Sequence, residues 1–296
     1  MFAMAGSRPS SPTASTILLS ALFLLPAVSI LVSCGYFDPL DSGVPSHTAT
    51  TWQKTFGGSG EDAAMAVQKT ADGGFILAGY TDAPGNFDVW LIKTGAAGNE
   101  EWSKTFGETQ AEGDSVRQTA EGGYIIGGTN QEDAFLLRTD ASGNKQWSRR
   151  FGTEFPDYGN FALQTRDGGY VLVGSTRSGL SGDFNAWLIK TDASGNEQWS
   201  WSYGGSAWDR ADWVQQTVDG GYVIVGMTRS FGPWEQVWLL KTDASGELQW
   251  STSFGGNGNE RGLSVQQTAD GGYVIAGYTD SFGAGDRDAY LIYYKR

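Results

Sequence analysis

Apolar and polar positions repeat along this chain with a period of about 50 residues. The clearest mark is an acidic residue followed by two glycines and an aromatic residue, as in Asp72-Gly73-Gly74-Phe75. The other four copies begin at Glu121, Asp167, Asp219 and Asp270, at steps of 49, 46, 52 and 51 residues. A repeat of this length indicates an array of one small supersecondary unit, so one copy predicts the fold of all.

Each repeat contains four runs with the character of β-strands. Turn residues separate the runs, for example Asp219-Gly220 and Ala244-Ser245-Gly246 in the fourth repeat. The second run is almost continuously apolar, as expected for a strand covered on both faces. In the fourth repeat the runs span 212–217, 221–226, 236–241 and 248–254. Four strands per unit at this period are typical of a β-propeller blade.

The two ends of the array predict how the propeller closes. The last repeat stops after its third strand, at 289–294, while the array begins with an unpaired fourth strand at 52–57. Pairing the first segment with the last repeat would complete a fifth blade and hide an exposed sheet edge. The sequence therefore predicts an all-β fold over residues 51–296. It is a five-bladed β-propeller with four antiparallel strands per blade, closed by the N-terminal strand.

Residues 52–296 resemble a widespread family of secreted bacterial and archaeal propeller-repeat proteins. Their repeat has the form DGGYxIxGxT followed by WLIKTDxxGxxxW, which Ser264 to Thr279 and Trp187 to Trp199 follow closely. The resemblance implies the fold and little about activity. A more distant likeness is to quinoprotein propellers, whose Trp-docking motif has the spacing from Gly195 to Trp199. The spacing from Asp192 to Gly195 is one residue shorter than theirs, and quinone enzymes have eight blades, so no quinone is expected.

The first 33 residues have the features of an export signal. They contain no acid and one base, Arg8, with an apolar run over 17–32. The end of this stretch, Leu31-Val32-Ser33-Cys34-Gly35, resembles the lipobox of bacterial lipoproteins. The resemblance implies a signal peptide over 1–33, cleavage before Cys34, lipid attachment there, and a tether over 34–50. Gly35 favours the outer membrane or cell surface; the alternative is a plain signal peptide with an incidental cysteine.

Composition narrows the chemistry available to the repeats. The net charge of −13 argues against a nucleic-acid partner or a polybasic membrane patch. Cys34 and His47 are the single cysteine and histidine, and both precede the repeats. A His/Cys zinc site and a Ser-His-Asp triad are therefore excluded from the repeats. We expect a monomer without a cofactor, with Ca²⁺ left open.

Acidic residues recur where the innermost strand of each blade begins, which places them at the mouth of the central channel. They are Asp62, Asp157, Asp209 and Glu260, with Glu112 or Asp114 in the second blade. A second set precedes the third strand: Asp88, Asp133, Asn185, Gln236 and Asp288. Carboxylates converging there would suit Ca²⁺ or the acid and base of a glycoside hydrolase. The alternative is that each accepts local backbone and Thr hydrogen bonds.

Residues that depart from the repeat indicate a ligand site. Four tryptophans outside repeat positions fall within 34 residues: Trp201, Trp208, Trp213 and Trp234. Arg177 and Arg229 stand where other blades have Asp or Asn, and matching loops of the preceding blade carry Phe155, Tyr158 and Phe184. We predict a site at the mouth of blades three and four. Its residues are Trp208, Trp234, Arg177, Arg229 and Phe184. The alternative is that these rings pack loops against one another.

These patterns favour a lipid-anchored module of the cell envelope that binds a glycan or a protein without catalysis. Aromatic platforms beside Arg, Asp and Asn suit sugar stacking or the anchors of a protein interface. Two alternatives stay open at this stage. One is a carboxylate-dependent glycoside hydrolase, and the other is an envelope assembly scaffold without a small ligand.

Overall fold

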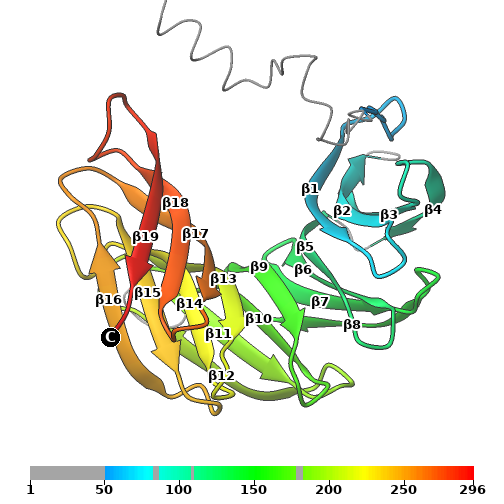
Figure 1. Cartoon of the computed structure of the whole chain (residues 1–296). Helices are drawn as coiled ribbons and strands as arrows, with labels where there is room; N and C mark the ends of the chain where they lie inside the picture. Colours follow the sequence, from blue (N-terminus) through cyan, green and yellow to red (C-terminus); the bar gives the residue numbers. More distant parts are fainter. Residues whose placement is uncertain (1–50, 83–86, 108–109, 178–182) are drawn as a thin grey trace, which may run out of the picture. The chain divides into compact units, whose positions relative to one another are not determined.

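The computed structural model describes residues 51–82, 87–107, 110–177 and 183–296 (Figure 1). The chain divides into residues 1–51 and a compact unit from Trp52 to Arg296. The expected signal peptide, Cys34 and the tether lie outside the described residues. Within the described ranges, no helix has the length and apolar character needed to cross a membrane.

The unit from Trp52 consists of antiparallel β-sheets, with nineteen strands and no helix among the residues described. Four sheets have four strands and the last has three. The first blade contains β1 (Asp62–Lys69), β2 (Phe75–Asp82), β3 (Phe87–Thr94) and β4 (Glu100–Phe106). The second contains β5 (Ala111–Gln118), β6 (Tyr124–Asn130), β7 (Asp133–Thr139) and β8 (Lys145–Phe151). The third contains β9 (Asp157–Gln164), β10 (Tyr170–Thr176), β11 (Asn185–Thr191) and β12 (Glu197–Tyr203). The fourth contains β13 (Asp209–Gln216), β14 (Tyr222–Thr228), β15 (Gln236–Thr242) and β16 (Leu248–Phe254), and the fifth β17 (Glu260–Gln267), β18 (Tyr273–Thr279) and β19 (Asp288–Tyr294).

Strands within each sheet follow chain order, from the innermost to the outermost. The innermost strands contact one another in succession from β1 to β17, so the five sheets are joined side by side along their first strands. The four runs predicted for the fourth repeat are confirmed. However, β13 begins three residues before the apolar pattern, at Asp209. Its polar start is buried because neighbouring loops satisfy it with hydrogen bonds, which an apolar count cannot detect.

Each innermost strand carries a β-bulge at the same repeat position. One residue of the innermost strand has no partner on the second strand. The residues before and after it pair with two directly adjacent residues of the second strand. These unpaired residues are Met65, Asp114, Asn160, Asp212 and Leu263. A bulge bends the strand and redirects a side chain, so this position differs physically from the rest of the strand.

The hydrophobic cores lie between blades. Val173 and Leu188 of the third blade pack with Val214 and Ile224 of the fourth, and all four are buried. The fourth-strand tryptophan of each blade meets the first aromatic residue of the next blade's second strand. Ring centroids are 5.9 Å apart for Trp102–Tyr124, 5.4 Å for Trp147–Tyr170, 6.1 Å for Trp199–Tyr222 and 5.7 Å for Trp250–Tyr273. The repeated tryptophans are therefore packing residues.

A glutamine at the end of each later innermost strand joins neighbouring blades. Its side-chain oxygen accepts a hydrogen bond from a backbone N–H in the turn of the preceding blade. The acceptors are Gln118, Gln164, Gln216 and Gln267, at 2.8–3.0 Å. Blade one has Lys69 at this position, which has no oxygen to accept such a bond.

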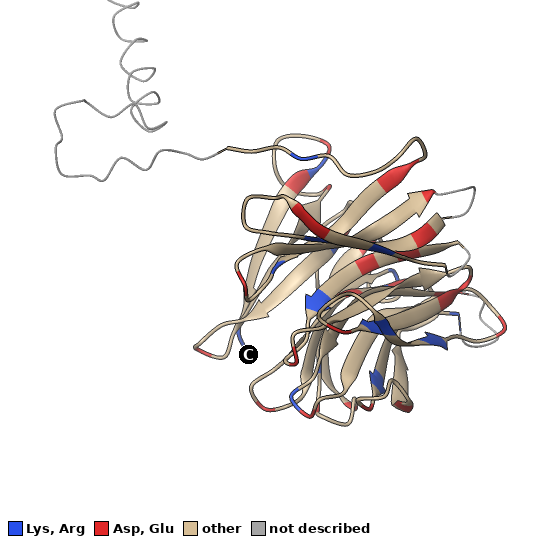
Figure 2. Cartoon of the chain, turned by 90° about the vertical axis from the view of Figure 1, so that its right-hand side faces the viewer, with Lys and Arg blue, Asp and Glu red and all other residues tan. Residues whose placement is uncertain are grey.

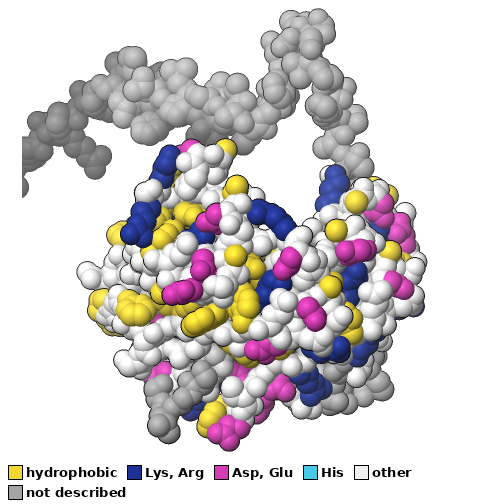
Figure 3. Space-filling model, turned by 90° about the horizontal axis from the view of Figure 1, so that it is seen from below, with side chains coloured by type: hydrophobic (Ala, Val, Ile, Leu, Met, Phe, Trp, Pro, Cys, Tyr) yellow, Lys and Arg dark blue, Asp and Glu magenta, His cyan; other side chains and the backbone are white. Residues whose placement is uncertain are grey.

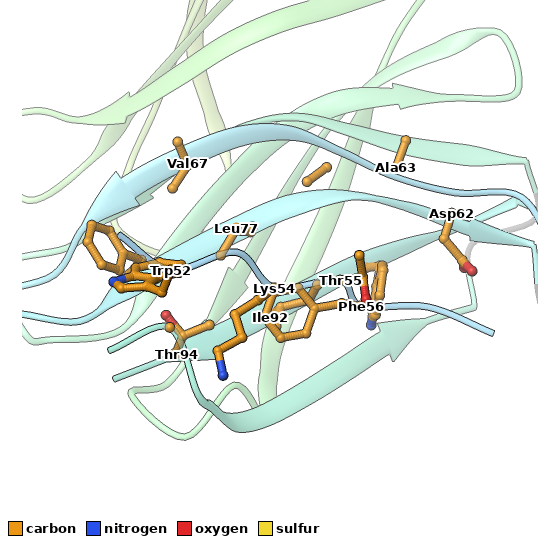
Figure 4. A pocket seen from close by; sticks show the side chains of 14 residues that line it. Trp52, Lys54, Thr55, Phe56, Asp62, Ala63, Val67, Leu77, Ile92 and Thr94 are labelled. Atoms are coloured by element: carbon orange, nitrogen blue, oxygen red, sulfur yellow. The ribbon is translucent and has the colours of Figure 1, made fainter. Parts of the chain in front are cut away.

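The fifth blade differs from the prediction. Its sheet ends at β19, and residues 52–57 form no strand. Instead they lie against the outward face of blade one, with the Trp52 ring 6.1 Å from Phe75. A cavity of about 490 Å³ remains there, and Figure 4 shows Leu77 and Ile92 between Trp52 and Phe56. Four blades thus have the expected four strands, the fifth has three, and among the residues described no strand closes the ring.

Candidate functional site

The recurrent acids are held within the blades. Asp157, Asp209 and Glu260 are fully buried. Asp209 accepts hydrogen bonds from the Gly205 N–H at 2.9 Å, from Ser230 Oγ at 2.6 Å and from Thr228 Oγ1. Each carboxylate thus ties the loop before its strand to the end of the second strand, which matches the local structural alternative.

The remaining acids repeat this pattern. Glu260 accepts from the Gly256 N–H at 3.1 Å and from Thr279 Oγ1 at 3.0 Å. Asp157 accepts from the Thr153 N–H at 2.5 Å and the Arg177 N–H at 3.2 Å. In Asp62, hydrogen bonds from the Thr81 hydroxyl and the Gly58 N–H lower the pKa of the carboxyl. No group of three or more His, Cys, Asp or Glu side chains suited to a metal ion occurs within the described ranges.

Blade two departs from the expected series of acids. Ala111 pairs with Asn130 as Asp62 pairs with Thr81, so Ala111 occupies the position of the acid. Glu112 and Asp114 follow one and three residues later. The prediction of Glu112 or Asp114 at this position was therefore wrong. Blade two has shorter loops, so counting residues from the other repeats does not locate the start of its first strand.

The second polar set packs against the acids of the following blade. Gln236 Nε2 lies 3.3 Å from Glu260 Oε2. Gly204 passes between the same two positions one blade earlier. A Cβ on it would lie 2.1 Å from Asn185 Oδ1 and 2.4 Å from Asp209 Oδ2. The glycine after the fourth-strand aromatic residue is thus required by close approach.

Four of the five residues predicted for a ligand site come together. A cavity of about 400 Å³, here called the outer cavity, is lined by Arg177, Asp183, Phe184, Ala207, Trp208 and Arg229. Trp234 is not among its lining residues, and its side chain is 53% exposed. The loops of blades three and four therefore bring four of the five predicted residues together, without Trp234.

Backbone hydrogen bonds hold the two aromatic residues of the outer cavity, Phe184 and Trp208, in place; these two rings are here called its aromatic floor. The Asp209 N–H donates to the Phe184 carbonyl at 2.7 Å, and the Arg229 N–H to the Trp208 carbonyl at 2.9 Å. The Arg229 guanidinium lies 5.4 Å from the centre of the Trp208 ring and donates from Nε to Glu235 Oε1 at 3.1 Å. The rings and the guanidinium are thus positioned before any ligand arrives.

The other two off-repeat tryptophans serve packing, as the alternative interpretation had it. Trp213 stacks on Phe161 with ring centroids 3.8 Å apart, and the Arg117 guanidinium lies 4.7 Å from the Phe161 ring. Trp201 donates from Nε1 to the Ser245 carbonyl at 3.0 Å, which joins the outermost strand of blade three to a turn of blade four.

A second cavity lies where the innermost strands of blades two to four begin, and it contains residues that the sequence did not predict to share a site. This inner cavity has a volume of about 310 Å³. It is lined by Gln110, Glu112, Asp114, Thr129, Gln131, Tyr158, Asn160 and Arg210. Two of them, Asp114 and Asn160, are bulge residues. The missed signal was a position where every blade has the same geometry but the side chain varies, with Asp, Asn, Met and Leu among the five blades.

An ionic network fixes one wall of the inner cavity. Arg210 donates from Nε to Asp212 Oδ1 at 2.9 Å and from Nη2 to Asn160 Oδ1 at 2.8 Å. Arg261 donates from Nε to Asp212 Oδ2 at 2.8 Å, and Asn160 Nδ2 donates to the Ala211 carbonyl at 2.7 Å. Paired guanidinium and carboxylate groups in this arrangement hold the polar wall rigid.

Asp114 has the most perturbed carboxyl of this cavity. Burial, together with the nearby Glu112 carboxylate, raises the pKa of Asp114 to about 7, against the opposing charge of Arg210. The carboxyl is thus protonated over much of the range below neutral pH, where it can donate a hydrogen bond as well as accept one.

The connection between β6 and β7, which borders the inner cavity, is short. β6 ends at Asn130 and β7 begins at Asp133, so two residues connect them, whereas eight connect β10 and β11. Gln131 and Gln110 have φ angles of 53° and 58°, and the Gln131 N–H donates to the Gln110 carbonyl at 3.0 Å. Left-handed backbone at glutamine is uncommon and clusters at functional sites.

Charged and apolar side chains are mixed on the faces of the molecule seen in two further views (Figure 2 and Figure 3). Figure 2 shows acidic and basic residues interspersed along the blades. Seen from below, hydrophobic side chains lie among charged ones (Figure 3). These faces therefore do not suggest one polymer of strong charge as the partner.

Comparisons with known proteins bear on the fold alone. No family model and no curated protein matches the chain. Among solved structures, puromycin hydrolase is similar with a TM-score of 0.51 and 14% identity, over 76% of this chain and 38% of that one. A protein from Lactobacillus plantarum has a TM-score of 0.48 and 12% identity, over 77% of this chain and 70% of that one. An endo-arabinase from Bacteroides thetaiotaomicron has a TM-score of 0.40 and 10% identity, over 75% of this chain and 90% of that one. The structural neighbours are propeller-like folds, in agreement with the antiparallel blades described above.

Proposed function

We propose that this protein is a non-enzymatic binding module whose ligand is a glycan held in the outer cavity. The observation that carries the proposal is the outer cavity itself, where Phe184 and Trp208 form an aromatic floor beside two guanidinium groups. An aromatic face suits the apolar face of a sugar ring, while Arg177, Arg229 and Asp183 offer partners for hydroxyl groups. A protein ligand is the other occupant that such anchors would suit.

The test is a thermal-shift panel of glycans on the full chain, repeated with Trp208→Ala. A ligand at a hundred times its Kd stabilises by about 2.7 kcal/mol, which is easily measured. We expect a shift with one class of glycan that Trp208→Ala removes. Trp201→Ala is the matched control, because this tryptophan is also partly exposed but lies away from both cavities. An unchanged shift in Trp208→Ala would refute the site.

The proposal also places the module in the cell envelope. The sequence around Cys34 supports export followed by lipid attachment, with the propeller held at the outer membrane or cell surface by the residues after Cys34. Membership of the secreted propeller-repeat family is part of this proposal. Radiolabelled palmitate incorporation that is lost in Cys34→Ser would support it, and equal labelling of both would refute it.

A glycoside hydrolase is the second candidate, favoured by one observation. Asp114 has a carboxyl pKa of about 7 and stands near Glu112 at the inner cavity, as an acid and base would. Release of reducing sugar from a polysaccharide, lost in both Asp114→Asn and Glu112→Gln, would support hydrolysis. Asp243→Asn, at an exposed turn, is the control. No release by the full chain from any polysaccharide of the panel would refute the hydrolase.

We further propose that the ring closes when residues 52–57 pair with β19. The face of blade five that points away from blade four is unburied: Leu291 is 72% exposed, whereas Leu91, Leu136, Leu188 and Leu239 are 0% exposed at the same repeat position. The outward face of blade one is likewise open, with Val67 at 60% where Val116 has 0%. In every other interface between blades, the residues at these repeat positions are buried. The exposed apolar faces of blades five and one would therefore bury each other if the ring closed.

Residues 52–57 already stand in the right relation to blade one for this closure. Trp52 meets Phe75 as Trp102 meets Tyr124, and it packs over Gly98 as Trp102 packs over Gly143. By the register of β3 and β4, Leu291 would pair with Lys54, because Leu91 pairs with Lys104. The segment would then complete blade five with a fourth strand.

A further inference from the structure

We propose that the outer and inner cavities are two subsites of one site, which takes an oligosaccharide of at least two sugar units. The inference rests on the proposed function and deepens it. One sugar unit lies on the aromatic floor of the outer cavity. The next unit reaches the polar inner cavity.

A row of aromatic rings joins the two cavities. Tyr158 lines the inner cavity, and its ring centroid lies 5.4 Å from that of Phe184. Phe184 lines the outer cavity, and its ring lies 6.2 Å from Trp208. Tyr158 and Trp208 are both partly exposed. A ligand on Trp208 therefore has a continuous aromatic path to the inner cavity, which two unrelated sites would not need.

The inner cavity has the chemistry of a site for a polyhydroxylated ring. Its lining combines carboxyl, amide, hydroxyl and guanidinium groups, with Tyr158 as its one aromatic side chain. Hydroxyl groups both donate and accept, so they can satisfy such a mixed set. An apolar peptide side chain would leave these polar groups without partners on desolvation, which is costly.

The inner wall is also held in shape without a ligand. Asn160 is fixed by bonds to Arg210 and to the Ala211 carbonyl, and Arg210 is fixed by Asp212. Prior fixation lowers the entropy lost when a ligand binds. The connection between β6 and β7, whose Gln131 lines the cavity, has only two residues, so a ligand chain that continues past blade two would meet a short loop.

The test measures binding of oligosaccharides of increasing length by calorimetry, using the full chain. The probes are glucose, xylose, arabinose and N-acetylglucosamine, each with its oligomers of two, three and four units. Three variants separate the subsites: Trp208→Ala in the outer cavity, Glu112→Ala in the inner cavity, and Tyr158→Ala between them. Trp201→Ala is the control, and unchanged melting temperatures show that the variants remain folded.

We expect one series to bind with affinity that rises about tenfold or more from one unit to two or three. Glu112→Ala and Tyr158→Ala should each remove most of that rise, while Trp208→Ala should weaken every length. If Trp208→Ala weakens binding but Glu112→Ala and Tyr158→Ala leave every affinity unchanged, the two-subsite inference is overturned and the outer-cavity function stands. A monomer that binds as tightly as its tetramer also overturns it. If no probe binds the full chain, both proposals fail.

Discussion

Leu291→Ala is the most direct test of ring closure, because the open and the closed ring predict different losses in the free energy of unfolding. In the structure as described, the Leu291 side chain is 72% exposed. Truncation of an exposed leucine usually changes the free energy of unfolding by less than about 0.5 kcal/mol. In a closed ring, Leu291 would be buried like Leu239, and truncation would cost about 2–5 kcal/mol.

The expected magnitude lies near the middle of that range. Full burial of a leucine side chain is worth roughly 1.5–3 kcal/mol, and the cavity left by truncation adds to the loss. We therefore expect Leu291→Ala to lower the free energy of unfolding by about 3 kcal/mol. For a domain of this size, each kcal/mol corresponds to roughly 2–4 °C in Tm, so the change is measurable by both heat and urea.

Two further leucines calibrate the assay. Leu239→Ala should show the full loss, since Leu239 is 0% exposed, and Leu248→Ala should show little, since Leu248 is exposed on an outermost strand. If Leu291→Ala matches Leu248→Ala, the closure proposal is wrong. A second measurement is independent of stability: in a Cys34→Ser background, Lys54→Cys with Leu291→Cys should form a disulfide on oxidation, detected by mass spectrometry.

Three other predictions concern charge and backbone. Asp114 has a folded pKa near 7, above its unfolded value near 4, so its burial penalty grows as pH rises between those values. Asp114→Asn should therefore leave stability nearly unchanged at pH 4 and raise it by up to about 4 kcal/mol at pH 8, measured by urea unfolding. Glu112 and Arg210 are the charged groups that act on this carboxyl, and equal effects at both pH values would refute the assignment. Lys241 is buried and pairs with Asp219 at 2.9 Å, so Lys241→Ala should destabilise by about 1–3 kcal/mol, and Lys104→Ala on an exposed strand by far less. Although burial opposes the change, Thr217 and Lys241 lower the pKa of Asp219, so this stabilisation is present above pH 4 and is lost as pH falls further. A melting temperature unchanged down to pH 2 would contradict that. Gly204→Ala would place a Cβ 2.1 Å from Asn185 Oδ1 and should destabilise the fold by about 2 kcal/mol or more. Gly58→Ala is the control, because a Cβ there has no neighbour within 4 Å and should cost little. Similar melting temperatures for the two variants would show that the loop relaxes around the added methyl group.

Most of the fold was predictable because all five blades pack their strands in the same way. Strand order, turns and the packing role of repeated tryptophans such as Trp199 follow from period and alternation. The three-stranded fifth blade was not predicted. A repeat shows which segments are equivalent, but pairing of 52–57 with β19 depends on whether two distant ends meet.

The candidate site was partly predictable for a related reason. Arg177, Arg229, Phe184 and Trp208 stood out because they break the repeat, and they do share a cavity. Trp234 breaks the repeat in the same way yet lies apart from it, since loop conformation decides where an off-repeat ring points. The inner cavity was missed because Asp114 and Asn160 occupy a bulge, and sequence alternation does not reveal an extra residue in a strand.

The bulge position separates recognition from folding. Its residue is extra to the pairing of the first two strands and belongs to none of the cores between blades. The five bulge residues therefore occupy equivalent positions on the innermost strands, where the side chain differs between blades while the strand pairing stays the same. Asp, Asn, Met and Leu already occur there in one chain. A library of substitutions at Met65, Asp114 and Leu263 would vary ligand preference with little loss of stability. Asp212 and Asn160 would stay constant in that library, because they hold Arg210 and Arg261 in place.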